Sequence, residues 1–178
     1  YAKPDGEMTM PTKDEWLDRW LRDAHAMEQQ AEQVLRAQIQ RLENYPQFRR
    51  RIEEHLAETE RQRALVEGCL ERRGTAPSGL KDVAGKLTAM MQGFTGVVAG
   101  DEVVKAALVS YAFEQFEAIS YRILASAAEA AGDMETARVC AEICREEEAM
   151  AAWLANHAPE VTHTFLDRDM ADLEEAKR

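Results

Sequence analysis

Glutamates at matched spacings are the residues of this sequence best suited to chemistry. Glu28 and Glu58 are 30 residues apart, and Glu117 and Glu147 are also 30 residues apart. The midpoint of each pair falls at a helix breaker. If each pair belongs to a helical hairpin that folds at its midpoint, the carboxylates of the pair lie level, ~20 Å from the turn. Four converging carboxylates would then need protons, cationic partners or metal ions, because an unpaired buried charge is very costly.

Two further side chains share the predicted inward faces. Glu114 precedes Glu117 by three residues, and His55 precedes Glu58 by three residues, so each pair lies on one side of its helix. Carboxylates with an imidazole suit iron, manganese or zinc, and helical bundles use such ligands in di-metal sites. The predicted metal ligands are Glu28, His55, Glu58, Glu114, Glu117 and Glu147. The alternative for His55 is a core histidine bonded to a nearby carboxylate such as Glu32.

Four long helices are predicted to position these residues. Each has an apolar stripe at helical spacing, and the predicted ligands fall on or beside the stripes. Thr12 followed by Glu15 indicates a capped start of the first helix, and Pro159 is predicted to end the fourth. The four predicted helices span residues 12–42, 46–73, 101–131 and 134–156.

The connection between the second and third helices is too long for a tight hairpin. It contains a shorter amphipathic pattern at residues 80–99, which predicts a helical crossover. The predicted fold is therefore all-α, a ferritin-like four-helix bundle with a helical crossover and a C-terminal helical tail. The expected organisation is a flexible N-terminus at residues 1–11, the bundle at 12–157 and the tail at 158–178.

Composition limits the partners and the compartment. The net charge of −11 disfavours nucleic acid, and no apolar run approaches the ~20 residues that span a bilayer. Three cysteines are too few and odd in number for a disulfide framework, which favours a reducing cytoplasm. Cys140 and Cys144 lie one helical turn apart and read better as small buried hydrophobic residues than as metal ligands.

Several segments together resemble a known family. They are Asp23–Gln30, His55–Gln62, Glu114–Tyr121 and Glu146–Glu147. They resemble the YciE/YciF-like branch of the ferritin-like superfamily, and the resemblance extends over residues 16–154. It implies stress-associated bacterial proteins, often homodimeric, with a site for two metal ions. Iron is the first expectation and manganese or zinc the alternatives, with oxygen or peroxide as a small oxidant.

Two departures from the usual di-iron pattern affect the expected activity. Met150 stands three residues after Glu147, where a histidine ligand is usual, and Arg61 stands three residues after Glu58. Arg61 is also a candidate cation for neutralising a carboxylate. The sequence therefore leaves three functions open: an oxidase or peroxide-consuming enzyme, a metal-binding protein without turnover, and a structural or interaction protein.

Overall fold

The computed structural model describes residues 10–77 and 101–171. All regular secondary structure in these residues is helical. The helices are α1 (Lys13–Ile39), α2 (Pro46–Arg72), α4 (Glu102–Ala131) and α5 (Met134–Met170). None of them is both long and apolar enough to cross a bilayer. The predicted crossover helix lies outside the described residues, as does nearly all of the predicted N-terminal segment.

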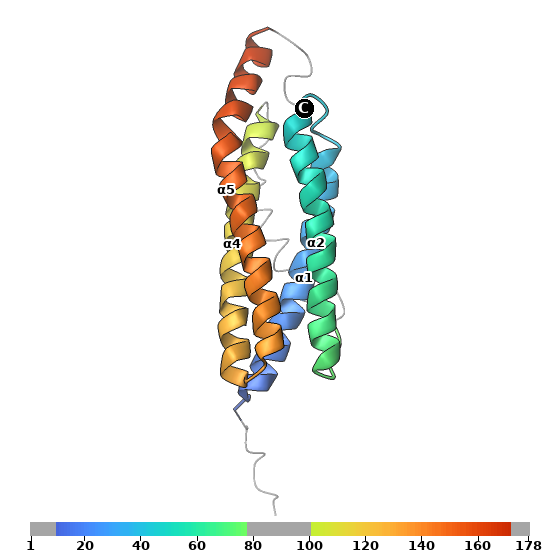
Figure 1. Cartoon of the computed structure of the whole chain (residues 1–178). Helices are drawn as coiled ribbons and strands as arrows, with labels where there is room; N and C mark the ends of the chain where they lie inside the picture. Colours follow the sequence, from blue (N-terminus) through green and yellow to red (C-terminus); the bar gives the residue numbers. More distant parts are fainter. Residues whose placement is uncertain (1–9, 78–100, 172–178) are drawn as a thin grey trace, which may run out of the picture.

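The four helices form a bundle of two antiparallel hairpins (Figure 1). α1 pairs with α2 and α4 pairs with α5, while α1 also packs beside α4 and α2 beside α5. α2 ends at the opposite end of the bundle from the start of α4. The end of α2 and the start of α4 are therefore placed as in ferritin-like folds, in which a long crossover joins the second and third helices. The predicted fold class is confirmed.

The helix boundaries follow local signals in the sequence. At the start of α1, Glu15 N–H donates to Thr12 Oγ1 over 3.2 Å, and Thr12 N–H donates to Glu15 Oε2 over 2.7 Å. This is the predicted capping box. α4 ends at Gly132, whose φ of 82° is left-handed and suits a residue without a Cβ. Asp133 then caps α5 by accepting a 3.0 Å hydrogen bond from Thr136 N–H.

The predicted end of the fourth helix is wrong. α5 continues through Pro159 to Met170, so the first part of the predicted tail extends this helix. A proline inside a helix removes one backbone hydrogen bond and costs about 3 kcal/mol. Here Val161 and Phe165 are buried in the same apolar cluster as Tyr45 and Phe48, and this burial offsets the cost.

A polar layer separates two apolar clusters in the core. One cluster includes Val66 of α2 and Cys144 of α5, and the other includes Ile52 and Met150 of the same helices. The buried residues between them on α2 are His55, Thr59 and Gln62. This layer contains the predicted metal centre.

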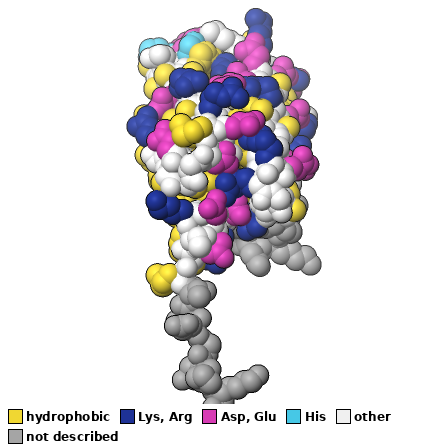
Figure 2. Space-filling view, turned by 60° about the horizontal axis from the view of Figure 1, so that its bottom comes forward, with side chains coloured by type: hydrophobic (Ala, Val, Ile, Leu, Met, Phe, Trp, Pro, Cys, Tyr) yellow, Lys and Arg dark blue, Asp and Glu magenta, His cyan; other side chains and the backbone are white. Residues whose placement is uncertain are grey.

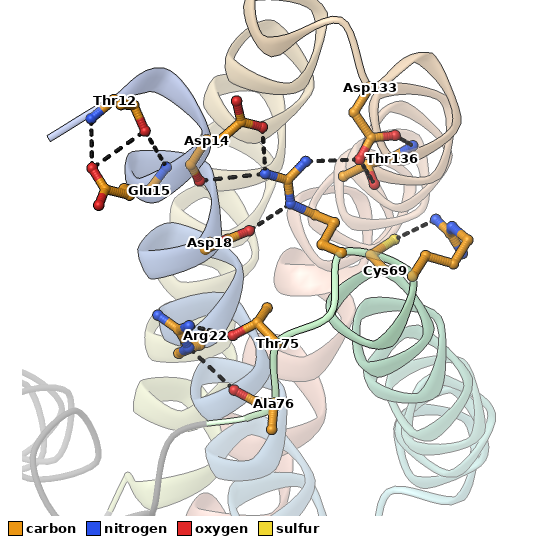
Figure 3. Close-up of polar contacts among 12 residues, drawn as sticks. Thr12, Asp14, Glu15, Asp18, Arg22, Cys69, Thr75, Ala76, Asp133 and Thr136 are labelled. Carbon is orange, nitrogen blue, oxygen red and sulfur yellow. Dashed lines mark hydrogen bonds and ion pairs between the residues drawn. The ribbon is translucent and has the colours of Figure 1, made fainter.

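Arg73 joins three helices at one end of the bundle through Asp14, Asp18 and Asp133, which are labelled in Figure 3. Its guanidinium lies 2.9 Å from Asp14 Oδ1, 2.5 Å from Asp18 Oδ1 and 3.1 Å from Asp133 Oδ2. The first two carboxylates belong to α1, and the third caps α5. One side chain at the end of α2 thus joins both hairpins.

Candidate metal centre

Four carboxylates and one imidazole meet in the polar layer. Every one of these side chains is buried, and together they come from all four helices. They are Glu28 of α1, His55 of α2, Glu114 and Glu117 of α4, and Glu147 of α5. Five of the six predicted ligands therefore lie inside the bundle, as the apolar stripes predicted.

His55 connects the second helix to the α4–α5 hairpin. Its Nε2 lies 2.9 Å from Glu114 Oε2 and 3.6 Å from Glu147 Oε2. One ligand atom from each of these three residues lies within 4.8 Å of the other two. With small side-chain adjustments, one cation could contact all three atoms.

Glu28 is hydrogen-bonded by a tyrosine of α4. The hydroxyl of Tyr121, which is buried on α4, donates a hydrogen bond to Glu28 Oε1. The second oxygen, Oε2, is buried and has no hydrogen-bond partner, and the same is true of Glu117 Oε1 and Glu147 Oε2. Buried polar atoms rarely lack a partner. Carboxylate oxygens left in this way fit a bound cation, so the residues suit a metal site.

Burial makes three of these carboxyl groups weaker acids than usual. It raises the pKa of Glu28 to about 8, against the opposing effect of the Tyr121 hydrogen bond. Burial also raises the pKa of Glu117 well above its ordinary value, and repulsion from Glu147 and Glu28 adds to the rise. The pKa of Glu147 rises for the same reasons, burial first and then repulsion from Glu114. Without a metal, this cluster retains protons near neutral pH.

His55 supplies positive charge to the metal-free layer. Burial by itself would lower its pKa, but the charge and hydrogen bond of Glu114, with help from Glu58 and Glu147, raise the pKa to about 10. The ring is therefore an imidazolium at neutral pH when no metal is present. It can donate one hydrogen bond to Glu114 and one to Glu58.

The expectation that Glu58 points inward is wrong. Its side chain is 35% exposed and lies 2.8 Å from His55 Nδ1 and 3.1 Å from Arg51 Nη2. Burial would raise its pKa, but the hydrogen bonds of His55 and Arg51 lower it. The inward positions on α2 belong to Thr59 and Gln62. Equal spacing from the turn predicted the level of Glu58 along the bundle, but not its rotation about the helix axis.

Arg61 does not reach the buried carboxylates. It lies on the surface, where it forms ion pairs with Glu142 and Glu146 of α5. Glu32 is likewise paired with Arg63, so it is not the partner of His55. The charges nearest the centre are therefore balanced by His55 and by protons rather than by an arginine.

The predicted role of the cysteines agrees with their burial. Cys69, Cys140 and Cys144 are all buried and unpaired, and all three belong to one apolar cluster. Burial raises the pKa of Cys140 to about 12, so it stays a neutral thiol. Met150 is fully buried in the other cluster, where it adds no ligand.

Comparison with known protein families identifies the family of this chain. The model for the family described as "Domain of unknown function (DUF892)" matches residues 12–167. The chain belongs to the DUF892 family. The predicted resemblance to YciF-like proteins with a ferritin-like fold is confirmed.

Solved structures share the fold of this DUF892 chain. A protein of Xanthomonas campestris pv. campestris is 38% identical, with 89% of this chain and 99% of that one covered and a TM-score of 0.76. The stress protein YciF of Escherichia coli is 24% identical, with 84% and 96% covered and a TM-score of 0.72. A bacterioferritin of Desulfovibrio desulfuricans with a diiron site is 19% identical, with 86% of both chains covered and a TM-score of 0.70. The last two comparisons bear on the fold alone.

Proposed function

We propose that this chain binds two metal ions in the buried layer, with iron as the first candidate and manganese or zinc as alternatives. The observation that carries the proposal is the convergence of His55, Glu114 and Glu147 within 4.8 Å, together with buried carboxylate oxygens that have no hydrogen-bond partner. Oxygen-rich ligands with a single imidazole favour these metals. Bound iron or manganese would supply redox chemistry with a small oxidant such as oxygen or peroxide.

In this proposal Glu58 does not bind metal but orients the ring of His55, which does. Metal-binding histidines usually donate their second ring N–H to a carboxylate, which fixes the direction of the ring. Glu58 accepts from His55 Nδ1, and Arg51 holds Glu58 in turn. This leaves Nε2 facing Glu114 and Glu147. Metal binding would then displace the Nε2 proton, so it would be coupled to proton release.

The decisive experiment is elemental analysis of protein purified without chelator. We expect close to two metal ions per chain in the wild type, and a loss of at least half of them in Glu147→Gln. The matched control is Glu148→Gln, because Glu148 is the next residue and pairs with Arg122 on the surface. Wild-type protein without metal, grown with iron, manganese and zinc supplied, would contradict the proposal.

Measurements of turnover and metal content distinguish the three functions that the sequence left open. With metal bound, iron(II) oxidation or peroxide loss above background supports an enzyme, and background rates support metal binding without turnover. A metal-free wild type supports the third function, a structural or interaction protein whose carboxyl groups are neutralised by protons and His55. We also propose the cytoplasm as its compartment, because the three buried thiols are unpaired.

A further inference from the structure

The five buried residues of the metal centre are shielded from solvent. Each of them is between 0% and 2% exposed, so a metal ion has to pass between two helices to reach them. The net charge of −11 attracts cations to the whole molecule. Acidic and basic side chains are interspersed over the face shown in Figure 2, so this general attraction does not select a route on that face. The route must therefore follow from local structure.

A narrow cleft between α1 and α4 reaches one of the ligands. Its outer lining includes the half-buried Val34 and Val109, and its inner lining includes the buried Ala31 and Glu114. Its volume is about 10 Å³, which is close to the least that holds one water molecule. Glu114 Oε2 lies 2.9 Å from His55 Nε2. The cleft thus leads from the surface to atoms of the proposed metal site.

Oxygen atoms occur at two successive levels of the cleft. At the first level, the side-chain amide of Gln38 on α1 donates a 2.8 Å hydrogen bond to Ser110 Oγ on α4. The other end of this amide, Gln38 Oε1, is buried and has no hydrogen-bond partner within the described residues. Glu114 provides the second level, one helical turn or ~6 Å further along α4. Oxygen ligands suit divalent ions such as manganese and iron, so an ion can exchange its water for protein oxygen at each level.

The other three contacts between neighbouring helices carry arginines. Arg63 pairs with an acid of α1 across the α1–α2 contact, and Arg61 pairs with acids of α5 across the α2–α5 contact. Arg122 does the same between α4 and α5. The described residues that line the α1–α4 cleft include no basic side chain, and the pair of Arg41 with Glu102 lies outside it. Because like charges repel, an approaching cation meets the least opposition at this cleft.

We propose that divalent metal ions enter the centre through the cleft between α1 and α4, and that the Gln38–Ser110 hydrogen bond closes it between passages. The inference rests on the proposed function, because it requires a centre that takes up metal. The closed cleft has room only for a water molecule, so the amide and the hydroxyl must separate before an ion passes. Gln38 and Ser110 then control the rate of entry, whereas the ligands control the affinity.

The first test fills the cleft without changing a polar atom. We expect metal-free Ala31→Leu to take up cobalt(II) several-fold more slowly than the wild type in stopped-flow absorbance, because the larger side chain occupies the cleft. The matched control is Ala24→Leu, since Ala24 is also a buried alanine of α1 in the same apolar cluster and does not line the cleft. The control should load at the wild-type rate. Equal rates for Ala31→Leu and the wild type would overturn the route.

The second test opens the cleft, and it remains decisive if Ala31→Leu fails to fold. Ser110→Ala removes the acceptor of the Gln38 amide, so loading should be about fivefold faster, the factor expected for the loss of one neutral hydrogen bond. Release of cobalt(II) to a chelator should accelerate by the same factor, because a route serves both directions and leaves the dissociation constant unchanged. Ser120→Ala is the control, since Ser120 on the same helix bonds only to Phe116 O. A changed dissociation constant, or unchanged rates, would exclude closure by this bond.

The route and the proposed function fail in different ways. A wild type that binds no metal at equilibrium would overturn both, and elemental analysis detects this outcome. A wild type that binds metal, but whose loading rate responds neither to Ala31→Leu nor to Ser110→Ala, would overturn the route alone. The expected result is equal metal content in all of these proteins at equilibrium, with slower loading in the first variant and faster loading in the second.

Discussion

The hydroxyl of Tyr121 on α4 donates a hydrogen bond to Glu28 Oε1 on α1, although the two residues are 93 positions apart in the chain. Both side chains are fully buried. This bond is the only hydrogen bond to the Glu28 carboxylate that the described residues provide, because Oε2 has no partner.

Removal of that hydroxyl should destabilise the metal-free protein. Tyr121→Phe leaves a buried carboxyl group without its donor, so we expect the free energy of unfolding to fall by about 1–3 kcal/mol. The measurement is urea unfolding in the presence of chelator. Tyr111→Phe is the control, since Tyr111 lies on the outward face of α4 and should change little. Equal stabilities for Tyr121→Phe and the wild type would show that the bond contributes nothing.

Metal should stabilise the fold by mass action. A ligand that binds only the native state adds on the order of a few kcal/mol at saturation, so chelation should lower the melting temperature. The double variant Glu117→Gln with Glu147→Gln should melt at the same temperature with and without chelator. We expect its metal-free form to be at least as stable as the wild type, because neutral amides replace two buried carboxyl groups whose ionised forms are disfavoured by burial and by repulsion. A wild type that is indifferent to chelator would count against a native metal.

The metal-free protein should lose stability as pH rises. The pKa of Glu28 is about 8 in the native state and 4.5 ordinarily, so between these values the native state holds a proton that the unfolded chain has released. His55 acts in the same direction between 6.5 and about 10. The contribution of these two groups to the free energy of unfolding is therefore complete at the acidic end of each range, and it is lost as the pH rises through the range. Urea unfolding with chelator should give a lower free energy at pH 8.5 than at pH 6, and Glu28→Gln should reduce the difference.

The sequence was sufficient for the fold and for most of the centre because both depend on local periodicity. Glu28, Glu114, Glu117 and Glu147 lie on apolar stripes, and burial followed from that pattern. Glu58 could not be placed in the same way. Its spacing from the turn predicted its level along the bundle, but the direction of its side chain depends on the rotation of α2 about the helix axis. The sequence signal for that rotation was the position of Thr59 and Gln62 on the apolar stripe of α2, where both are buried.

Features that depend on contacts between distant segments were not predictable. Pro159 is a helix-breaking signal in any local reading of the sequence. α5 nevertheless continues, because Val161 and Phe165 find apolar partners around Tyr45 and Phe48. In the same way, the contacts of Arg73 bring together three aspartates from two separate parts of the chain.

Replacement of that proline should stabilise the protein. Pro159→Ala restores a backbone donor and removes a steric clash inside α5, so we expect the free energy of unfolding to rise by about 1–3 kcal/mol. Pro46→Ala is the control, because Pro46 lies in the first turn of α2, where the missing donor has no helical partner. Thermal unfolding of both variants tests this. A lower melting temperature for Pro159→Ala would mean that α5 requires a bend at this point.

The division of the centre between two hairpins has a consequence for the order of folding. Glu28 and His55 belong to the α1–α2 hairpin, and the other three buried carboxylates belong to the α4–α5 hairpin. Each hairpin is built from contacts close in sequence, which form quickly, whereas joining the hairpins requires the slower closure of long loops. The burial that raises the pKa values of Glu28, Glu117 and Glu147 is therefore complete only when the two halves come together. We expect a proton or cation to be most important at that late step, where it would speed assembly rather than the formation of either half.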